Sequence, residues 1–180
     1  MPDPLVSVAD PRPAASVIIV RDAPTGAPEP LEVYMIRRKQ AMKFLGGFYA
    51  FPGGKVDADD ASAAALGACH GLDADTAARC FPGHDSPAPL AFWVAAVREL
   101  LEESGVLLAC DGTGRDVDPG RVESARRALV VDKEPFSAIL ARAGWRCDLR
   151  RLRYLSYFVT PRTSPIRFAA RFFLCRLPSG

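Results

Sequence analysis

The sequence lacks long hydrophobic runs, paired cysteines and a strong net charge. No run of 18 apolar residues occurs, which excludes a membrane-spanning helix. The first 14 residues hold four prolines and neither a basic start nor an apolar core, so no signal peptide is predicted and a cytoplasmic location is expected. A net charge of +2 neither favours nor excludes a polyanionic partner.

Cysteine and histidine are also sparse. The five cysteines are widely spaced and include no C-x-x-C pair, which predicts reduced thiols rather than a disulfide framework. His70 and His84 lie near Cys69 and Cys80, but at a spacing that matches no zinc cluster. Basic and aromatic residues are not interleaved along a stripe, so nucleic acid is not expected as a partner.

The chain is long and apolar enough to fold as one domain. Its 180 residues, 49% of them hydrophobic, can bury a core of ordinary size. We expect a disordered leader over residues 1–14 and a single domain over residues 15–180. Mixed strands and helices joined by hairpin connections favour an α+β fold.

An acidic segment near the middle of the chain carries the strongest chemical signal. Residues 98–106 read RELLEESGV, which places Glu99, Glu102 and Glu103 on one face of a predicted helix. Like charges at this spacing destabilise a helix by about 0.2–0.5 kcal/mol per pair. Arg98 can pair with Glu102 but cannot neutralise all three, so a divalent cation with oxygen ligands is indicated. For a Glu-rich stretch taken alone, the alternative is a solvated charged face.

A glycine-rich turn before this helix changes that balance. Residues 51–57 read FPGGKVD, a break that lets the backbone approach a ligand closely, and acids follow at Asp57, Asp59 and Asp60. Together the turn and the helix resemble the Nudix box: Gly54 opens it, Asp60 stands at its early glutamate, and residues 98–106 close it. The spacer between the two halves, residues 61–97, has 37 residues, 30 more than the compact form of the box.

A long insertion in the box is a feature of one branch of the Nudix hydrolases, the coenzyme A and acyl-coenzyme A diphosphatases. The resemblance extends over about residues 15–177. It implies a Nudix αβα sandwich with a mixed central sheet, and metal-dependent hydrolysis of the diphosphate bond in coenzyme A or its acyl esters. By the same resemblance, Mg²⁺, with Mn²⁺ as an alternative, is held by Gly54, Glu99, Glu102 and Glu103, and Arg98 joins these glutamates as a catalytic residue. The catalytic base stays open between a helix glutamate and a later loop acid.

The substrate site is expected upstream of the glycine turn. Arg38, Lys43 and Gly47 match a coenzyme A signature found beside the Nudix box, although Lys39 departs from it. Together with Gly53 and Gly54 they are the expected substrate-binding residues, and the cations would receive the 3′-phosphate. The alternative is a basic loop that keeps the surface soluble. Further candidates for the same anion are Arg162, Arg167 and Arg171.

Two other functions stay open at this point. One is a Nudix hydrolase of another nucleoside diphosphate derivative, such as a dinucleotide, a nucleotide sugar or a capped RNA end. The other is a catalytically silent Nudix domain that binds a nucleotide and regulates another process. Intact glutamates argue against the silent domain, because a binding module does not need a self-repelling acidic cluster.

Pattern and propensity predict the following elements. Strands are expected at 15–21, 31–37, 154–159 and 170–177, with a short extended piece at 48–51. The predicted helices are 61–67, 74–80, 91–104, 121–129 and 135–143, the first two in an insertion over residues 61–90, which continues into a loop at 81–89.

The end of the sequence raises a question about the second helical layer. A Nudix sandwich closes with a helix after its last strands, whereas this sequence ends soon after the RFFL strand. We expect a truncated form, or that a helix between Arg121 and Ala143 or a second subunit takes the closing role. An exposed apolar sheet face that supports a homodimer is the expected consequence.

Overall fold

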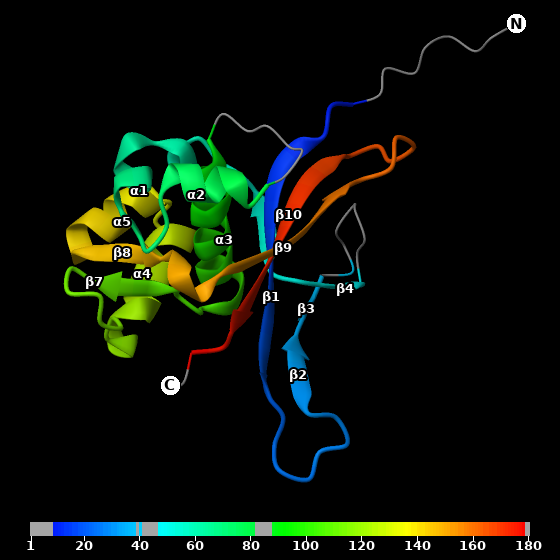
Figure 1. Cartoon of the computed structure of the whole chain (residues 1–180), viewed down its shortest axis with the longest axis horizontal. Coiled ribbons are helices and arrows are strands. Elements are labelled where there is room, and N and C mark those ends of the chain that lie inside the picture. The colour runs from blue at the N-terminus through cyan, green and yellow to red at the C-terminus, as the bar shows by residue number, and fades with distance from the viewer. Residues whose placement is uncertain (1–8, 39, 41–46, 82–87, 179–180) are drawn as a thin grey trace, which may run out of the picture.

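A computed structural model describes residues 9–38, 40, 47–81 and 88–178. Its main sheet has the order β2-β1-β10-β9, formed by Leu31–Tyr34, Arg12–Asp22, Phe168–Arg176 and Arg153–Val159 (Figure 1). The short strand β5, Gly53–Lys55, also pairs with β1. β1 and β10 are parallel, and the other pairs of this sheet are antiparallel. The mixed sheet and the helices packed against it confirm the predicted α+β class.

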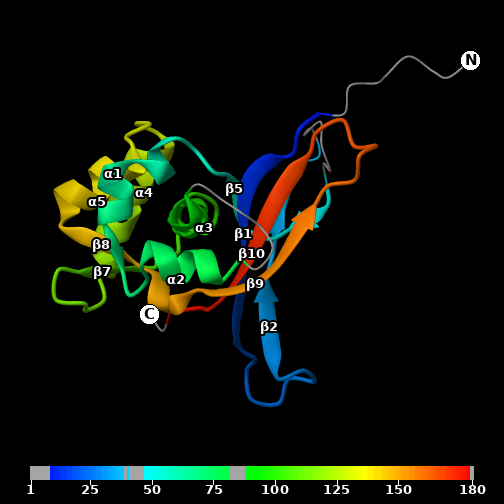
Figure 2. The ribbon, with the colours of Figure 1, turned by 45° about the horizontal axis from the view of Figure 1, so that its top comes forward.

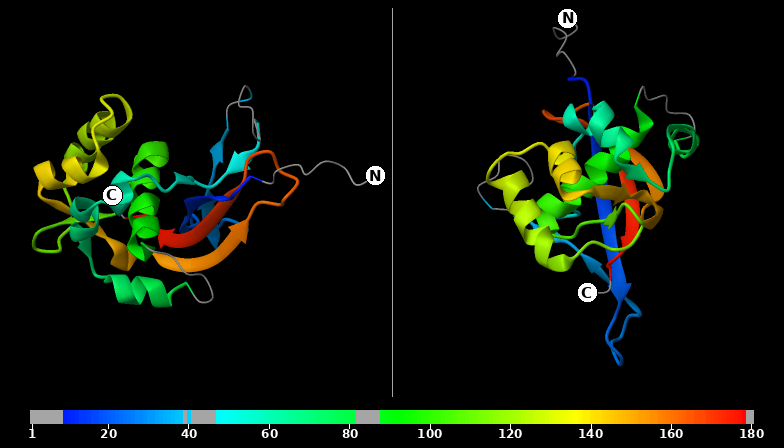
Figure 3. Two further views of the ribbon diagram at one scale, coloured as in Figure 1. Left: turned by 90° about the horizontal axis from the view of Figure 1, so that it is seen from above. Right: turned by 90° about the vertical axis from the view of Figure 1, so that its left-hand side faces the viewer.

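Helix α3, Pro89–Ser104, lies between this sheet and a second group of elements (Figures 2 and 3). That group contains the sheet β6-β8-β7. Its strands are Cys69–His70, Trp145–Asp148 and Ala109–Asp111. The remaining elements are α1, α2, α4 and α5 (Ala63–Gly67, Ala74–Arg79, Pro119–Val130 and Phe136–Ala143) and the 3₁₀ turns η1 (Asp59–Ala61) and η2 (Leu149–Arg151). With elements on both sides, α3 is the centre of the core.

The sequence explains how α3 begins and ends. Pro89 occupies the first turn, where its missing N–H is not needed. Gly105 ends the helix with φ +76°, and its N–H donates to the Leu101 carbonyl at 3.0 Å. The helix is buried from Leu90 through Leu101, whereas the sequence predicted burial of one face and a start at Ala91. The second buried face comes from packing against α1, α2 and α4, which helical periodicity does not report.

Alternation along β1 and β10 turns one face of the main sheet toward α3. Val17 and Phe173 are partners in the parallel register and are fully buried. Phe173 contacts Trp93 of α3 with ring centroids 4.7 Å apart, and Phe81 stacks on the same tryptophan at 6.4 Å. These aromatic contacts fix α3 against the sheet and thereby set the position of its acidic end.

Several boundaries differ from the sequence prediction. β1 begins at Arg12 rather than Ala15. The single strand predicted at 31–37 is broken at Met35, because Leu31–Tyr34 pairs with β1 while β3, Ile36–Arg37, pairs with β4, Tyr49–Ala50. Strands β6, β7 and β8 were not predicted, since each has only two to four residues and shows no clear alternation. In the loop predicted at 81–89, residues 82–87 lie outside the described part, and α3 already begins at Pro89.

Among the described residues, all helices lie on one side of the main sheet. α4 and α5 lie on the same side as α3, so they do not take the closing role on the other face. That face carries exposed apolar side chains: Leu31 is 53% exposed, Val33 is 50% exposed and Phe158 is 62% exposed. The expected apolar face is therefore present, and the homodimer stays a prediction. None of the described helices combines the length and apolarity needed to cross a bilayer.

The cysteines support a test of this packing. All five are free thiols, and Cys69, Cys110, Cys147 and Cys175 are buried. Burial raises the pKa of the Cys69 and Cys175 thiols to about 11. Because the thiolate is the reactive form, these residues should react slowly at pH 8. We expect a disulfide reagent to modify Cys80 quickly in the native protein and all five thiols in denaturant. Rapid modification of all five thiols in the native protein would contradict the packing.

Candidate active site

The glycine turn lies directly against α3. β5 pairs with β1, with Gly53 opposite Ser16 and Gly54 opposite Ala15. A Cβ atom on Gly53 would lie 2.4 Å from the Ala15 carbonyl oxygen. A Cβ on Gly54 would lie 2.4 Å from Oε1 of Glu99. Glycine at position 54 therefore leaves the space that the Glu99 carboxylate occupies.

Glu103 links the same turn to the helix. Its Oε2 accepts a hydrogen bond from the Gly53 N–H at 2.8 Å. Burial raises the pKa of Glu103, while this hydrogen bond and the positive charge of Arg38 oppose the shift. Burial likewise raises the pKa of Glu99 to about 7, although Arg98 lowers it. Residues of two segments that are distant in the sequence, the glycine turn and the end of α3, thus lie in contact.

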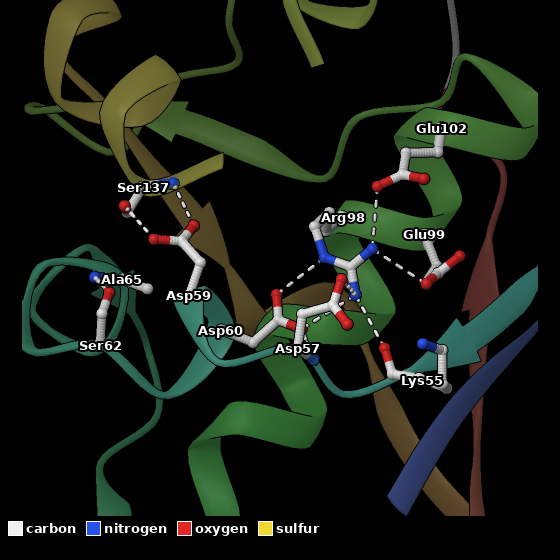
Figure 4. A network of polar contacts seen from close by, with 10 residues as sticks. All are labelled: Lys55, Asp57, Asp59, Asp60, Ser62, Ala65, Arg98, Glu99, Glu102 and Ser137. Atoms are coloured by element: carbon white, nitrogen blue, oxygen red, sulfur yellow. Dashed lines mark hydrogen bonds and ion pairs between the residues drawn. The ribbon is translucent and has the colours of Figure 1, made fainter. Parts of the chain in front are cut away.

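Arg98 organises the carboxylates around it (Figure 4). Its Nε and Nη2 donate to Oδ1 and Oδ2 of Asp60, each at 2.9 Å. Nη1 donates to Glu99 at 2.9 Å and to Glu102 at 2.8 Å, and Nη2 also donates to the Lys55 carbonyl at 2.8 Å. Arg98 is 5% exposed and Asp60 is fully buried. Burial alone would lower the pKa of Arg98, but Asp60 and the glutamates raise it, so the guanidinium stays charged.

This network gives Arg98 and Asp60 roles that the sequence did not specify. The sequence indicated the pairing of Arg98 with Glu102, which is present, but not its contacts with Asp60 and Lys55. Arg98 fixes Glu99 and Glu102 and is itself held by Asp60. Among the described residues, its hydrogen bonds go to carboxylates and to one backbone carbonyl. Asp60, at the early-glutamate position of the box, binds Arg98 through both oxygens.

A second acid of the turn fixes helix α5. Asp59 accepts hydrogen bonds from the Ser137 N–H at 2.9 Å and from the Ser137 hydroxyl at 2.6 Å. This contact connects residues 78 apart in the sequence. No pattern in the sequence could have indicated it. As a result, the connection between α4 and α5 is held beside the acidic end of α3.

A cleft of about 310 Å³ opens at this position, and we call it the acid cleft. Part of its lining comes from acids of the turn and residues of α3, and the other part from the end of α4, the α4–α5 connection and the start of α5. Its lining residues are Asp57, Asp59, Arg98, Glu99, Glu102, Leu129, Lys133, Glu134, Pro135 and Phe136.

The donor set of the cluster fits a hard divalent cation. Oε2 of Glu99, Oε2 of Glu102 and Oε1 of Glu103 are in no hydrogen bond or ion pair with another described residue. Oxygen ligands of this kind suit Mg²⁺ or Mn²⁺. In the described part of the chain, no three acidic, histidine or cysteine side chains already form a metal site. Binding would therefore draw these glutamate oxygens together beside Gly54, the position of the predicted ligand set.

Besides Gly53 and Gly54, three residues were predicted to bind the substrate: Arg38, Gly47 and Lys43. Arg38 lies close enough to Glu103 to lower its pKa, so it is near the acidic cluster. Gly47 has φ +81° and closes the β3–β4 hairpin, with its N–H donating to the Arg38 carbonyl at 3.1 Å. Lys43 lies outside the described residues.

Arg171 and Arg167 contact residues outside the acidic cluster. The Arg171 guanidinium is buried, 3.8 Å from the ring centroid of Phe92 and 4.4 Å from that of Phe81. It therefore faces the aromatic core. Arg167 donates to the Thr160 carbonyl at 3.1 Å and to the Ala9 carbonyl at 2.9 Å.

Comparison with known proteins agrees with this geometry. The family model of the NUDT19 Nudix domain matches residues 11–179. The chain belongs to the Nudix hydrolase family. Among curated relatives, this Nudix hydrolase is 30% identical to human "Acyl-coenzyme A diphosphatase NUDT19", over 92% of this chain and 56% of that protein. It is 30% identical to "Putative nudix hydrolase 7" of Caenorhabditis elegans, over 79% of this chain and 38% of that protein.

A solved structure supports the fold of this Nudix hydrolase. The crystal structure of a NUDIX hydrolase from Alicyclobacillus acidocaldarius is 34% identical, with a TM-score of 0.65. The match covers 94% of this chain and 71% of that one. The curated relatives are longer, and this chain spans about two fifths of the nematode protein and a little over half of the human one. The Nudix family is thus established for the region that contains the acid cleft.

Proposed function

We propose that this Nudix hydrolase cleaves the diphosphate bond of coenzyme A or an acyl-coenzyme A with the help of Mg²⁺. The observation that carries the proposal is that Glu99 lies against Gly54 and Glu103 binds Gly53, close to Arg38. Glu102 joins Glu99 through Arg98. The printed name of the human relative, an acyl-coenzyme A diphosphatase, supports the same substrate.

The reaction follows from the charges at the site. Water attacks one phosphorus atom, the bridging P–O bond breaks, and one product carries the former bridging oxygen. A carboxylate accepts the proton of the attacking water, and the products are 3′-phosphoadenosine 5′-phosphate and an (acyl-)phosphopantetheine. Glu99, Glu102 and Glu103 would hold the cation, which neutralises diphosphate charge and polarises the phosphorus. Arg98 keeps two of these carboxylates oriented, and Gly54 leaves room beside them.

Arg38 is the residue proposed to bind the 3′-phosphate. Its Nε is buried and has no hydrogen-bond partner among the described residues. A buried donor without a partner is destabilising, by about 1–3 kcal/mol. A phosphate oxygen of the substrate would satisfy it, and guanidinium groups bind phosphate well.

An apolar cavity offers space for the non-reacting part of the substrate. Its volume is about 640 Å³, within the range of ligand sites. Ser104, the residue after Glu103, lines it together with residues of β1 and β2 and Leu177. The other lining residues are Ile19, Val20, Arg21, Glu32, Val33, Tyr34 and Val106. We propose that the pantetheine arm or acyl chain occupies this cavity, since both have apolar segments.

The proposal is tested with a substrate panel in Mg²⁺, comparing coenzyme A, dephospho-coenzyme A, acyl-coenzyme A, ADP-ribose, NADH and diadenosine polyphosphates. We expect coenzyme A derivatives to have the highest kcat/KM. Dephospho-coenzyme A and the Arg38→Gln variant should each show about 10- to 100-fold lower kcat/KM, because a charge-assisted hydrogen bond is lost. Product analysis identifies the cleaved bond.

Arg79→Gln on α2 is the matched control for this measurement. Arg79 is outside the cavity and the acid cleft and bonds only to Thr76 among the described residues, so the variant should cleave coenzyme A as the wild type does. Equal cleavage of coenzyme A and dephospho-coenzyme A would reject the role of Arg38. Preference for ADP-ribose or a dinucleotide would reject coenzyme A as the substrate while leaving a diphosphatase.

A further inference from the structure

Lys133 stands out because its backbone conformation is costly for a lysine. Its φ is +58°, and it is the only non-glycine residue with positive φ in the described part of the chain. Residues with a Cβ atom avoid this region at an expense of about 1–2 kcal/mol. Such outliers persist where the surrounding structure or a function requires them.

A positive φ at the end of a helix is usually taken by glycine, as in the two long helices other than α4. α3 and α5 end at Gly105 and Gly144, with φ +76° and +69°. After α4, the chain turns back at Lys133, and the Glu134 N–H donates to the Ala128 carbonyl at 3.0 Å. Glycine would make the same turn without strain. The presence of lysine is therefore not explained by the turn.

The position of Lys133 supplies a reason. It lines the acid cleft together with Glu99 and Glu102. The α4–α5 connection is fixed by the two hydrogen bonds between Asp59 and Ser137 (Figure 4). The turn that carries Lys133 is thus built into the site.

Two cationic residues line the acid cleft, Arg98 and Lys133, and of these only Arg98 forms ion pairs with described residues. Arg98 also lines the cleft, but its donors are directed at carboxylates and the Lys55 carbonyl. Within the described residues, no ion pair involves Lys133. An ammonium group on a flexible stem binds phosphate oxygens as a point charge without demanding planar geometry.

We propose that Lys133, which lines the acid cleft together with Glu99 and Glu102, binds a phosphate oxygen of the substrate diphosphate. The inference rests on the proposed function, because it takes a diphosphate as the occupant of the cleft. It adds a substrate-binding residue from the α4–α5 connection, which lies outside the Nudix box. The charge of the lysine accounts for its presence at a turn that glycine would make without strain.

The test compares Lys133→Gln, Lys133→Gly and Lys133→Arg with the wild type. We expect the Gln and Gly variants to lose about 10- to 100-fold in kcat/KM for the best diphosphate substrate, and the Arg variant to keep most activity. Lys133→Gly should also raise Tm by about 1–3 °C, because glycine relieves the positive φ. Loss of activity together with gain of stability separates a binding role from a structural one. The control is Arg127→Gln, which removes an exposed cation of α4 outside the cleft and should change neither quantity.

Calorimetry with ADP and Mg²⁺ measures binding without turnover. We expect Lys133→Gln to weaken ADP binding about tenfold or more. If the wild type cleaves a diphosphate and Lys133→Gln matches it in kcat/KM and ADP affinity, the role of Lys133 is overturned while the proposed function stands. If the wild type cleaves no diphosphate, the proposed function fails, and ADP affinity still decides on Lys133: equal affinity in wild type and variant, or no binding by either, overturns it.

Discussion

Replacement of Glu103 by glutamine is expected to lower kcat by about 10²–10⁴-fold while the protein remains folded. Glu103 is one of the three carboxylates of the acidic cluster, and its Oε1 makes no hydrogen bond or ion pair with another described residue. The amide keeps the size of the side chain and an oxygen that can accept the Gly53 N–H bond, but it removes the negative charge. A cation would then lose a ligand, or the reaction would lose a base.

Although kcat should fall, the thermal stability of the Glu103→Gln variant should not. Burial and the charge of Glu102 raise the pKa of Glu103, so its ionised form is disfavoured in the metal-free protein. The neutral amide relieves both effects, and Tm without metal should stay equal or rise. The measurement is steady-state kinetics in Mg²⁺ with a parallel thermal melt in a chelator.

Glu123→Gln is the matched control, since Glu123 is an exposed residue of α4 outside the acid cleft. It should retain wild-type kcat. Full activity of the Glu103 variant would remove this residue from the catalytic site. Loss of activity accompanied by unfolding would point to a structural role instead.

Replacement of Arg98 by methionine should produce the largest loss of stability among the substitutions considered. Arg98 and Asp60 are both buried and joined by two hydrogen bonds of 2.9 Å. Without the guanidinium, Asp60 is left as a buried carboxyl without its main partner, and Glu99 and Glu102 lose a shared donor. Breaking a buried pair in this way destabilises a protein by about 3–5 kcal/mol.

Urea unfolding measures this effect, and the expected decrease corresponds to a fall in Tm of about 6–20 °C. The double variant Arg98→Met/Asp60→Leu should be destabilised by less than the sum of the single variants, because the second change removes the unpaired charge. Arg21→Met, which breaks an exposed pair with Glu32, serves as control and should change stability by about 0–1 kcal/mol. Additive effects in the double variant would show that Arg98 and Asp60 are not coupled.

Local patterns accounted for the long helices and strands. α3, α4, α5, β9 and β10 were predicted within a few residues because each has several turns, or a long apolar run, with clear boundaries such as Gly105 and Gly144. The short strands β6, β7 and β8 escaped prediction, since two to four residues carry too little periodicity. The break at Met35 was not predicted because residues 31–37 show no turn residue, whereas Leu31–Tyr34 and Ile36–Arg37 pair with different strands.

For the candidate site, spacing within one helix was sufficient to place Glu99, Glu102 and Glu103 together. The glycine turn was recognisable because Gly53 and Gly54 form a local break in the sequence. The contacts of Arg98 with Asp60, and of Asp59 with Ser137, join residues 38 and 78 apart. No local pattern encodes such pairs, because they arise only when the helices pack.

The sequence by itself determined the chemical groups of this protein: three glutamates on one helix face, two glycines at a break, and the box that resembles the Nudix hydrolases. Tertiary structure alone decided which partners the charged side chains have. It directed Arg98 to Asp60, turned Arg171 into the aromatic core and brought Lys133 to the acid cleft. The physical reason is that side-chain spacing along a helix is fixed by the backbone, whereas a salt bridge or a cleft wall depends on how distant elements pack.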